Sequence, residues 1–115
     1  MPDTTCPFCL IAAREAPAEI LHATETVMAF RDANPKAPTH ILLIPREHVE
    51  SAAELTERHA GMLSDLMQAA AHLARTEELD GGYRLVCNTG PEGGQTVFHL
   101  HFHLLGGRHM TWPPG

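Results

Sequence analysis

The chain has 115 residues, of which 43% are hydrophobic and 19% charged, and its formal net charge is −6 at pH 7. This length predicts one folded domain spanning residues 1–115, and this composition excludes disordered and fibrous classes. A membrane-spanning class is excluded because no apolar run approaches about 20 residues. The acidic balance argues against a nucleic-acid polymer as partner, and an N-terminus unlike a secretory leader predicts a cytoplasmic protein.

Apolar spacing and turn residues predict the elements of the first half. Residues 6–15 suit a short amphipathic helix that ends at Ala16-Pro17, because a residue before proline is disfavoured in helical conformation. Residues 31–38 contain two prolines and form a loop. Short or continuously apolar β-like runs predict strands, which are, in chain order, residues 19–22, 26–30 and 40–44.

The second half predicts one long helix and two further strands. Residues 51–78 carry apolar side chains at three- and four-residue spacings, as in an amphipathic helix N-capped near Thr56. Tyr83 and the methionines of this helix are assigned to the core. Two strands follow around a glycine-rich loop, at residues 83–88 and 96–105. The expected fold class is α+β, a five-stranded antiparallel sheet with the long helix on one face and a short N-terminal helix.

Three histidines alternate with apolar residues in the stretch Phe98-His99-Leu100-His101-Phe102-His103-Leu104. Because successive side chains of a strand point to opposite faces, the histidines are expected on one face at about 7 Å intervals. Threonine, lysine or glutamate would face water there at less cost, so the pattern favours a functional site. Two kinds of site fit it: a metal centre with imidazole ligands, and covalent catalysis by a neutral imidazole at phosphorus.

The loop before the histidines favours phosphoryl chemistry. Gly93-Gly94-Gln95-Thr96 offers successive backbone N–H groups, which can form a nest for phosphate oxygens. Asn88 lies on the preceding predicted strand. Donors directed at non-bridging oxygens would stabilise charge that develops in the transition state.

Taken together, these residues resemble the histidine triad (HIT) superfamily. The stretch His99 to Leu105 matches its signature, and the WPPG ending resembles the Hint branch. The resemblance covers nearly the whole chain and extends to Phe30-Arg31-Asp32, Ala37-Pro38-Thr39-His40, Gly81-Gly82-Tyr83-Arg84 and Gly106-Gly107-Arg108. It implies a purine nucleoside phosphoramidase, which cleaves a P–N bond and releases AMP or GMP.

Catalytic roles follow from the resemblance. His101 would be the nucleophile that forms a nucleotidyl-histidine intermediate, with its Nδ1 bonded to the backbone carbonyl of His99. His103 and His40 would support the phosphate and the protonation pattern.

The resemblance also implies a nucleotide-binding set. Its members, besides His101 and His103, are Asp32 at the ribose, Phe8 and Phe30 near the base, Asn88, Gly94, Gln95 and Thr96 at the phosphate, and Trp112. Thr96 stands where relatives often carry serine, a change expected to be nearly neutral. Arg31 and Ala33 flank Asp32 where other side chains are common, which leaves the base preference open. Members of this branch are homodimers with a continuous sheet, so the tail, residues 106–115, is expected near the partner's site.

The pair Cys6-Pro7-Phe8-Cys9 predicts a separate metal site. Two cysteines at this spacing form a thiolate clamp suited to Zn²⁺, and a structural site needs two more ligands, commonly histidines. A thioredoxin-like redox pair is less favoured, because no strand precedes it, and two reduced buried cysteines without metal are the alternative. Similarity to zinc-binding bacterial HIT proteins implies that His48 and His99 complete the site with Cys6 and Cys9, and that the zinc is structural.

Other functions stay open at this point. A dinucleoside polyphosphate hydrolase fits the triad, although the WPPG ending argues against it. A nucleotide-binding regulatory adaptor with weak residual catalysis, and a catalytic metal held by the triad itself, are the remaining alternatives.

Overall fold

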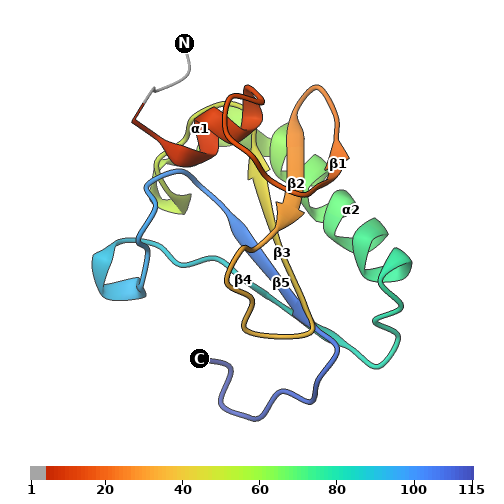
Figure 1. Cartoon of the computed structure of the whole chain (residues 1–115). Helices are drawn as coiled ribbons and strands as arrows, with labels where there is room; N and C mark the ends of the chain where they lie inside the picture. The colour runs from red at the N-terminus through yellow and green to blue at the C-terminus, as the bar shows by residue number, and fades with distance from the viewer. Residues whose placement is uncertain (1–4) are drawn as a thin grey trace.

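The computed structural model describes residues 5–115 and contains one antiparallel sheet with the strand order β1-β2-β3-β5-β4 (Figure 1). The predicted fold class is confirmed, with one long helix and one short N-terminal helix. The strands are β1 (Ile20–Ala23), β2 (Val27–Arg31), β3 (Thr39–Pro45), β4 (Tyr83–Val86) and β5 (Phe102–Gly106). The helices are α1 (Pro7–Ala12) and α2 (Ala60–Thr76).

Strand β3 lies at the centre of the sheet, and all its residues are buried. Because its side chains alternate, Ile41 and Leu43 pack beneath α2, while Leu42 and Ile44 pack on the opposite face with Phe8. Burial of each such side chain contributes about 1.5–3 kcal/mol. One face of the sheet is therefore covered by α2, and the other supports α1.

The helix predicted over residues 51–78 is shorter than expected. Two 3₁₀ turns, η1 (Ala52–Glu54) and η2 (Glu57–His59), precede α2. Thr56 and His59 form a capping box at η2, in which the Thr56 N–H donates to Nδ1 of His59 at 2.9 Å. These local side-chain bonds compete with a continuous helix, so the prediction was wrong for residues 51–59.

The strand predicted over residues 96–105 is also shorter. Pairing of β5 with β3 begins at Phe102, opposite Leu43. Before that point the N–H of Leu100 donates to the carbonyl of Val49 at 2.6 Å, in the turn that follows β3. The chain keeps the predicted alternation, because Leu100 and Leu104 are buried in the core beneath α2 while the ring of His101 contacts Phe8 on the other face.

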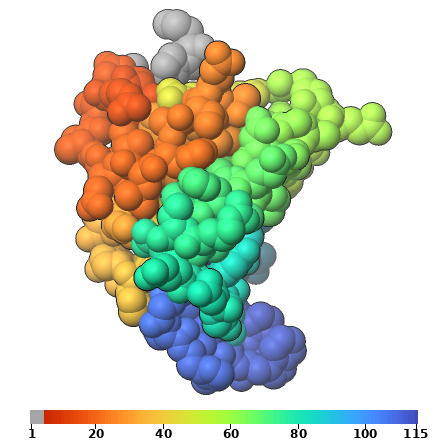
Figure 2. Space-filling model, turned by 90° about the vertical axis from the view of Figure 1, so that its right-hand side faces the viewer, coloured from red at the N-terminus to blue at the C-terminus, as the bar shows by residue number. Residues whose placement is uncertain are grey.

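Surface positions correct two further expectations. Tyr83 is 43% exposed and Met67 of α2 is 38% exposed, so their assignment to the core was wrong. Strand β4 ends at Val86 rather than residue 88. The C-terminal segment lies at the end of the molecule opposite α1 (Figure 2). Within residues 5–115 no helix has both the length and the apolar character needed to cross a bilayer.

Candidate functional site

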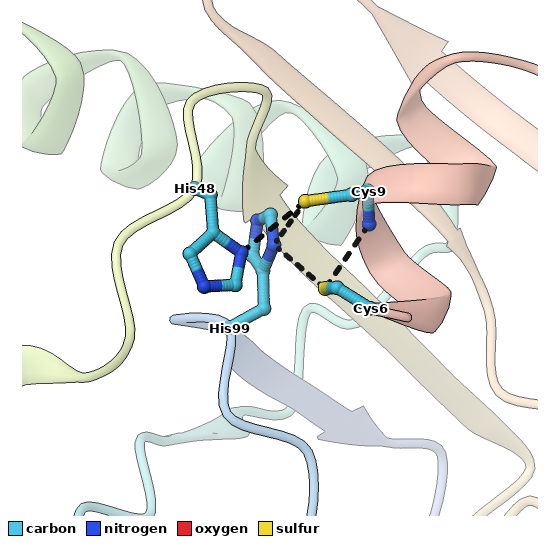
Figure 3. Close-up of side chains that lie close together, drawn as sticks. All are labelled: Cys6, Cys9, His48 and His99. Atoms are coloured by element: carbon cyan, nitrogen blue, oxygen red, sulfur yellow. Dashed lines mark hydrogen bonds between the residues drawn. The ribbon is translucent and has the colours of Figure 1, made fainter. Parts of the chain in front are cut away.

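Four metal-ligating side chains from three parts of the chain converge beside the N-terminus of α1 (Figure 3). Cys6 and Cys9 come from the start of α1, His48 from the turn after β3, and His99 from the segment before β5. One ligand atom of each lies within 4.8 Å of all the others. Sγ of Cys9 is 3.2 Å from Nδ1 of His48, and Sγ of Cys6 is 3.3 Å from Nδ1 of His99.

Local sequence explains the placement of the two cysteines. Cys6 is the N-cap of α1, and Pro7 occupies the first helical position, where its missing N–H costs nothing. Sγ of Cys6 accepts the N–H of Cys9 at 3.3 Å. Residues three apart on a helix share a face, so both sulfur atoms point to the same place.

The ring of His99 is oriented for metal binding. Its Nε2–H donates to the carbonyl of Pro45 at 2.9 Å, which leaves the Nδ1 lone pair toward the two sulfur atoms. Burial, the main cause, lowers the pKa of His99 to about 4, and the neutral ring is the form that binds metals. Two cysteine sulfurs and two imidazole nitrogens are a donor set that fits tetrahedral Zn²⁺.

A second cluster lies at the other end of the triad. Nε2 of His40 is 2.9 Å from Nδ1 of His103 and 3.4 Å from a carboxylate oxygen of Asp32. The backbone N–H of Lys36 donates to Nδ1 of His40 at 3.0 Å, so the proton of this neutral ring is on Nε2. His40 therefore donates to His103, and the Nε2–H of His103 is available to a ligand.

This second cluster is set for proton sharing rather than for a metal. Coordination by Nε2 of His40 would move the ring proton to Nδ1, where it would face the N–H of Lys36. Burial is the largest cause that lowers the pKa of both His40 and His103, the latter to about 4. Both rings are therefore neutral near pH 7.

His101 lies between the two clusters. Its side chain is buried, and its Nδ1–H donates to the backbone carbonyl of His99 at 2.8 Å. The remaining nitrogen, Nε2, then carries a lone pair. The ring centroid is 5.0 Å from that of Phe8 and 5.0 Å from that of His103, with edge-to-face geometry. The geometry thus holds Nδ1 of His101 as a donor and leaves Nε2 as the nitrogen that can supply the electron pair of a nucleophile.

A cavity borders the triad and contains six of the predicted site residues. These are Phe8, Phe30, Asp32, Thr96, His101 and His103. Sequence reasoning missed the apolar residues that complete the lining, among them Ile11, Leu42 and Val97, because apolar side chains carry no signal beyond that of a core. The cavity combines an apolar wall with a few polar groups, as small-molecule sites do.

Four predicted nucleotide-binding residues lie outside that lining. Asn88 donates to the carbonyl of Gly93 at 2.8 Å and so braces the glycine loop. The buried Gln95 side chain donates to the carbonyl of Glu50 at 2.7 Å, so it faces inward. Gly94 has φ +86°, a left-handed conformation suited to glycine. Trp112 is 84% exposed, so its side chain is not packed into the part of the protein formed by residues 5–115.

Two backbone groups that orient histidines of the site were not predicted from the sequence. The carbonyl of Pro45 orients His99, and the amide of Lys36 orients His40. Backbone groups are present at every residue, so no sequence pattern could have identified them. The carbonyl of His99, in contrast, was predicted from the family resemblance, and its bond to His101 is present.

Comparisons with known proteins agree with this fold and site. The family described as HIT domain matches residues 13–110. A 14 kDa zinc-binding protein of Zea mays is 47% identical over 98% of this chain and 90% of that protein. The adenylylsulfatase HINT1 of Arabidopsis thaliana is 43% identical over 98% of this chain and 78% of that protein. The crystal structure of a HIT family hydrolase from Legionella pneumophila superposes with a TM-score of 0.94 at 46% identity, covering 96% of this chain and 99% of that one.

The fold, the triad and these matches define a histidine triad protein. The chain belongs to the HIT family of nucleotide hydrolases. It is closely similar to a family member named for zinc binding, and its own Cys and His cluster is suited to a metal ion.

Proposed function

We propose that this protein hydrolyses purine nucleoside 5′-phosphoramidates to a nucleoside monophosphate and an amine. The observation that carries the proposal is the hydrogen bond from Nδ1–H of His101 to the carbonyl of His99, at 2.8 Å. It gives a neutral imidazole a single tautomer whose lone pair is free beside a nucleotide-sized cavity.

In the first half-reaction, Nε2 of His101 attacks phosphorus and the P–N bond breaks. The amine leaves with a proton taken from solvent, and the nucleotide stays bonded to Nε2. The Nε2–H of His103 would donate to a non-bridging oxygen, because its Nδ1 accepts from His40. In the second half-reaction water attacks phosphorus and gives up a proton to solvent, the bond from phosphorus to Nε2 breaks, and the nucleoside monophosphate is released.

The remaining predicted contacts fit a nucleotide in the same cavity. The Asp32 carboxylate would accept hydrogen bonds from the ribose hydroxyls. Phe8 and Phe30, whose ring centroids are 5.6 Å apart, would provide the apolar wall for the base. Thr96 would contact the phosphate. Asn88 braces the neighbouring glycine loop, in which the N–H groups of Gly94 and Gln95 donate to the carbonyls of Pro91 and Gly90.

Zinc at the Cys6, Cys9, His48 and His99 site would be structural. Four protein ligands close a tetrahedral site and leave no open position for substrate. The bound ion would supply cross-linking of α1 to the segments at His48 and His99. The name of the Zea mays relative supports this assignment.

A second candidate substrate is adenylyl sulfate. The Arabidopsis thaliana relative, 43% identical, carries the name adenylylsulfatase. The same nucleophile would form the same nucleotidyl-histidine, with sulfate as leaving group in place of an amine. Sulfate needs no proton to leave, so this reaction would depend less on proton supply.

A substrate panel tests the proposed function. Adenosine 5′-phosphoramidate, adenylyl sulfate and a dinucleoside polyphosphate would be incubated separately with the protein and AMP release measured. We expect turnover of the phosphoramidate, reduced by roughly 1000-fold or more in His101→Ala. The control His72→Ala, an exposed histidine of α2 outside the cavity, should match the wild type. Faster cleavage of the polyphosphate than of the phosphoramidate would contradict the proposal.

We also propose that the protein is a homodimer with a continuous sheet. β4 is an edge strand of the sheet, and it exposes the apolar side chains of Tyr83 and Leu85. Arg84 of the same strand donates to the backbone carbonyls of Thr111 and Pro114, which ties the tail to this edge. A second copy paired along β4 would cover the apolar edge and bring Trp112 near the partner's cavity.

A further inference from the structure

We propose that His99 is a positioning residue that couples zinc occupancy to the orientation of the nucleophile. Its side chain belongs to the metal cluster, and its backbone carbonyl accepts the hydrogen bond from His101. One residue therefore contacts both sites. The inference rests on the proposed function, because it takes His101 as the nucleophile.

The carbonyl of His99 is not held by the sheet. Pairing of β5 with β3 begins only at Phe102, so His99 and His101 precede the ladder. Within a sheet, hydrogen bonds between strands would fix the position of this carbonyl. Here contacts outside the sheet fix it instead. The orientation of His101 depends on them, since this carbonyl is the acceptor for its Nδ1–H.

Two kinds of contact hold the His99 backbone. The first is made with the turn after β3: Leu100 N–H donates to Val49, and Nε2–H of His99 donates to Pro45. The second is the cluster with the two sulfur atoms, at 3.3 Å and 3.5 Å from Nδ1 of His99. A metal ion there would join His99 by direct bonds to α1 and to the turn that carries His48.

The metal cluster also holds the wall against which His101 rests. Phe8 lies between the two cysteines in the sequence, and both cysteines and Phe8 are buried. Its ring centroid is 5.0 Å from that of His101 and 6.0 Å from that of His99. Fixing Cys6 and Cys9 therefore fixes the ring that limits movement of the nucleophile.

Loss of zinc should release both constraints. The ring of His99 would keep its bond to Pro45 and weak hydrogen bonds to the two sulfur atoms in place of metal bonds. Helix α1 would keep its apolar contacts and the hydrogen bond from Arg46 to the carbonyl of Ala12. His101 would then populate the tautomer with its proton on Nε2, which has no lone pair for phosphorus. Loss of a group that orients a functional side chain changes activity by roughly 10- to 100-fold, and we expect a loss in that range.

Ring-nitrogen NMR tests the coupling without any substrate. Histidine-labelled protein would be compared zinc-loaded, after zinc removal by a chelator with thiols kept reduced, and after zinc is restored. We expect His101 to show one tautomer, protonated at Nδ1, only when zinc is bound. Single-turnover formation of the nucleotidyl adduct should fall by roughly 10- to 100-fold and recover with zinc.

A variant of one metal-ligating residue distinguishes loss of the coupling from unfolding of the protein. His48→Gln retains three ligands and leaves His99 and His101 in place, and we expect it to show intermediate tautomer populations that rise with added zinc. The matched control is His72→Gln, on the exposed side of α2, which should behave as wild type. Amide spectra of β2 and β3 report whether the fold is kept.

The outcomes separate the two proposals. A zinc-free protein with an unchanged His101 tautomer and unchanged adduct rate would overturn the coupling. A zinc-loaded protein that forms no adduct with adenosine 5′-phosphoramidate would instead overturn the proposed function, while the tautomer measurement would still test the coupling.

Discussion

Three backbone groups assign the protons of the histidine cluster. The carbonyl of Pro45 orients His99, the carbonyl of His99 orients His101, and the amide of Lys36 orients His40. Neutral imidazole is both a donor and an acceptor, so fixing one nitrogen assigns the role of the other. The same residue type can thereby take the proposed roles of metal ligand, nucleophile and proton donor within one site.

Protonation of His103 should reduce stability in acid. Its pKa is lowered from 6.5 to about 4, chiefly by burial. Between these pH values the unfolded chain binds a proton that the folded chain does not. The free energy of unfolding should therefore fall as the pH drops from 6.5 toward 4, by on the order of 2 kcal/mol from this group. The contribution is fully present above pH 6.5.

Urea unfolding at a series of pH values measures this effect. The variant His103→Asn lacks the titrating ring, so its free energy of unfolding should fall less steeply over the same window. His109→Asn, at an exposed position, is the control. Equal slopes for wild type and His103→Asn would show that burial of this ring does not oppose its protonation.

At the scale of elements, one ion-pair network joins α2 to the sheet. Arg31 at the end of β2 makes two hydrogen bonds to Glu77, the residue after α2, at 2.8 Å and 3.0 Å. Thr39 of β3 donates to the same carboxylate at 3.4 Å. This anchors the strand ends on either side of the loop that carries Asp32.

Glu77→Gln should destabilise the protein by about 1 kcal/mol, because a bidentate, partly buried pair is lost. Glu19 also bonds Arg31, at 3.2 Å, but its side chain is 69% exposed. Glu19→Gln is thus a matched control, expected to cost only about 0.3 kcal/mol. Chemical denaturation of both variants measures the difference, and equal losses would argue against the anchoring role of Glu77.

Sequence patterns predicted an element correctly where the burial of its own side chains determines its secondary structure. β3 was predicted because a strand buried on both faces is a continuous apolar run. Residues 96–101 keep the side-chain alternation of a strand, yet their backbone partners lie in the turn after β3. Residues 51–59 keep helical spacing but are diverted by the capping box at Thr56. In both cases the deciding hydrogen bonds leave no trace in apolar periodicity.

At the scale of the whole molecule, the two faces of the sheet have different tasks. α2 covers one face and forms the larger core, while α1 and the triad occupy the other. The triad and the cysteine pair were identifiable in the sequence from their spacing, whereas Asp32 was predicted from the family resemblance. The cavity wall and the backbone partners were not, since they arise only from packing.

The proposed dimer can be tested at the exposed edge strand. Leu85→Arg places a charge where β4 would pair with a second copy, so we expect a monomer by light scattering after size-exclusion chromatography. Met67→Arg is the control, because Met67 is 38% exposed on α2 while Leu85 is 36% exposed. A wild-type chain that runs as a monomer, or a dimer unaffected by Leu85→Arg, would contradict this interface.

The account as a whole depends on a covalent bond between Nε2 of His101 and phosphorus. Incubation with adenosine 5′-phosphoramidate, a basic quench that preserves a phosphoramidate linkage, and intact-protein mass spectrometry test it most directly. We predict a gain of one AMP in the wild type, mapped to His101 and absent in His101→Ala. Cleavage at an undiminished rate in that variant would contradict the account.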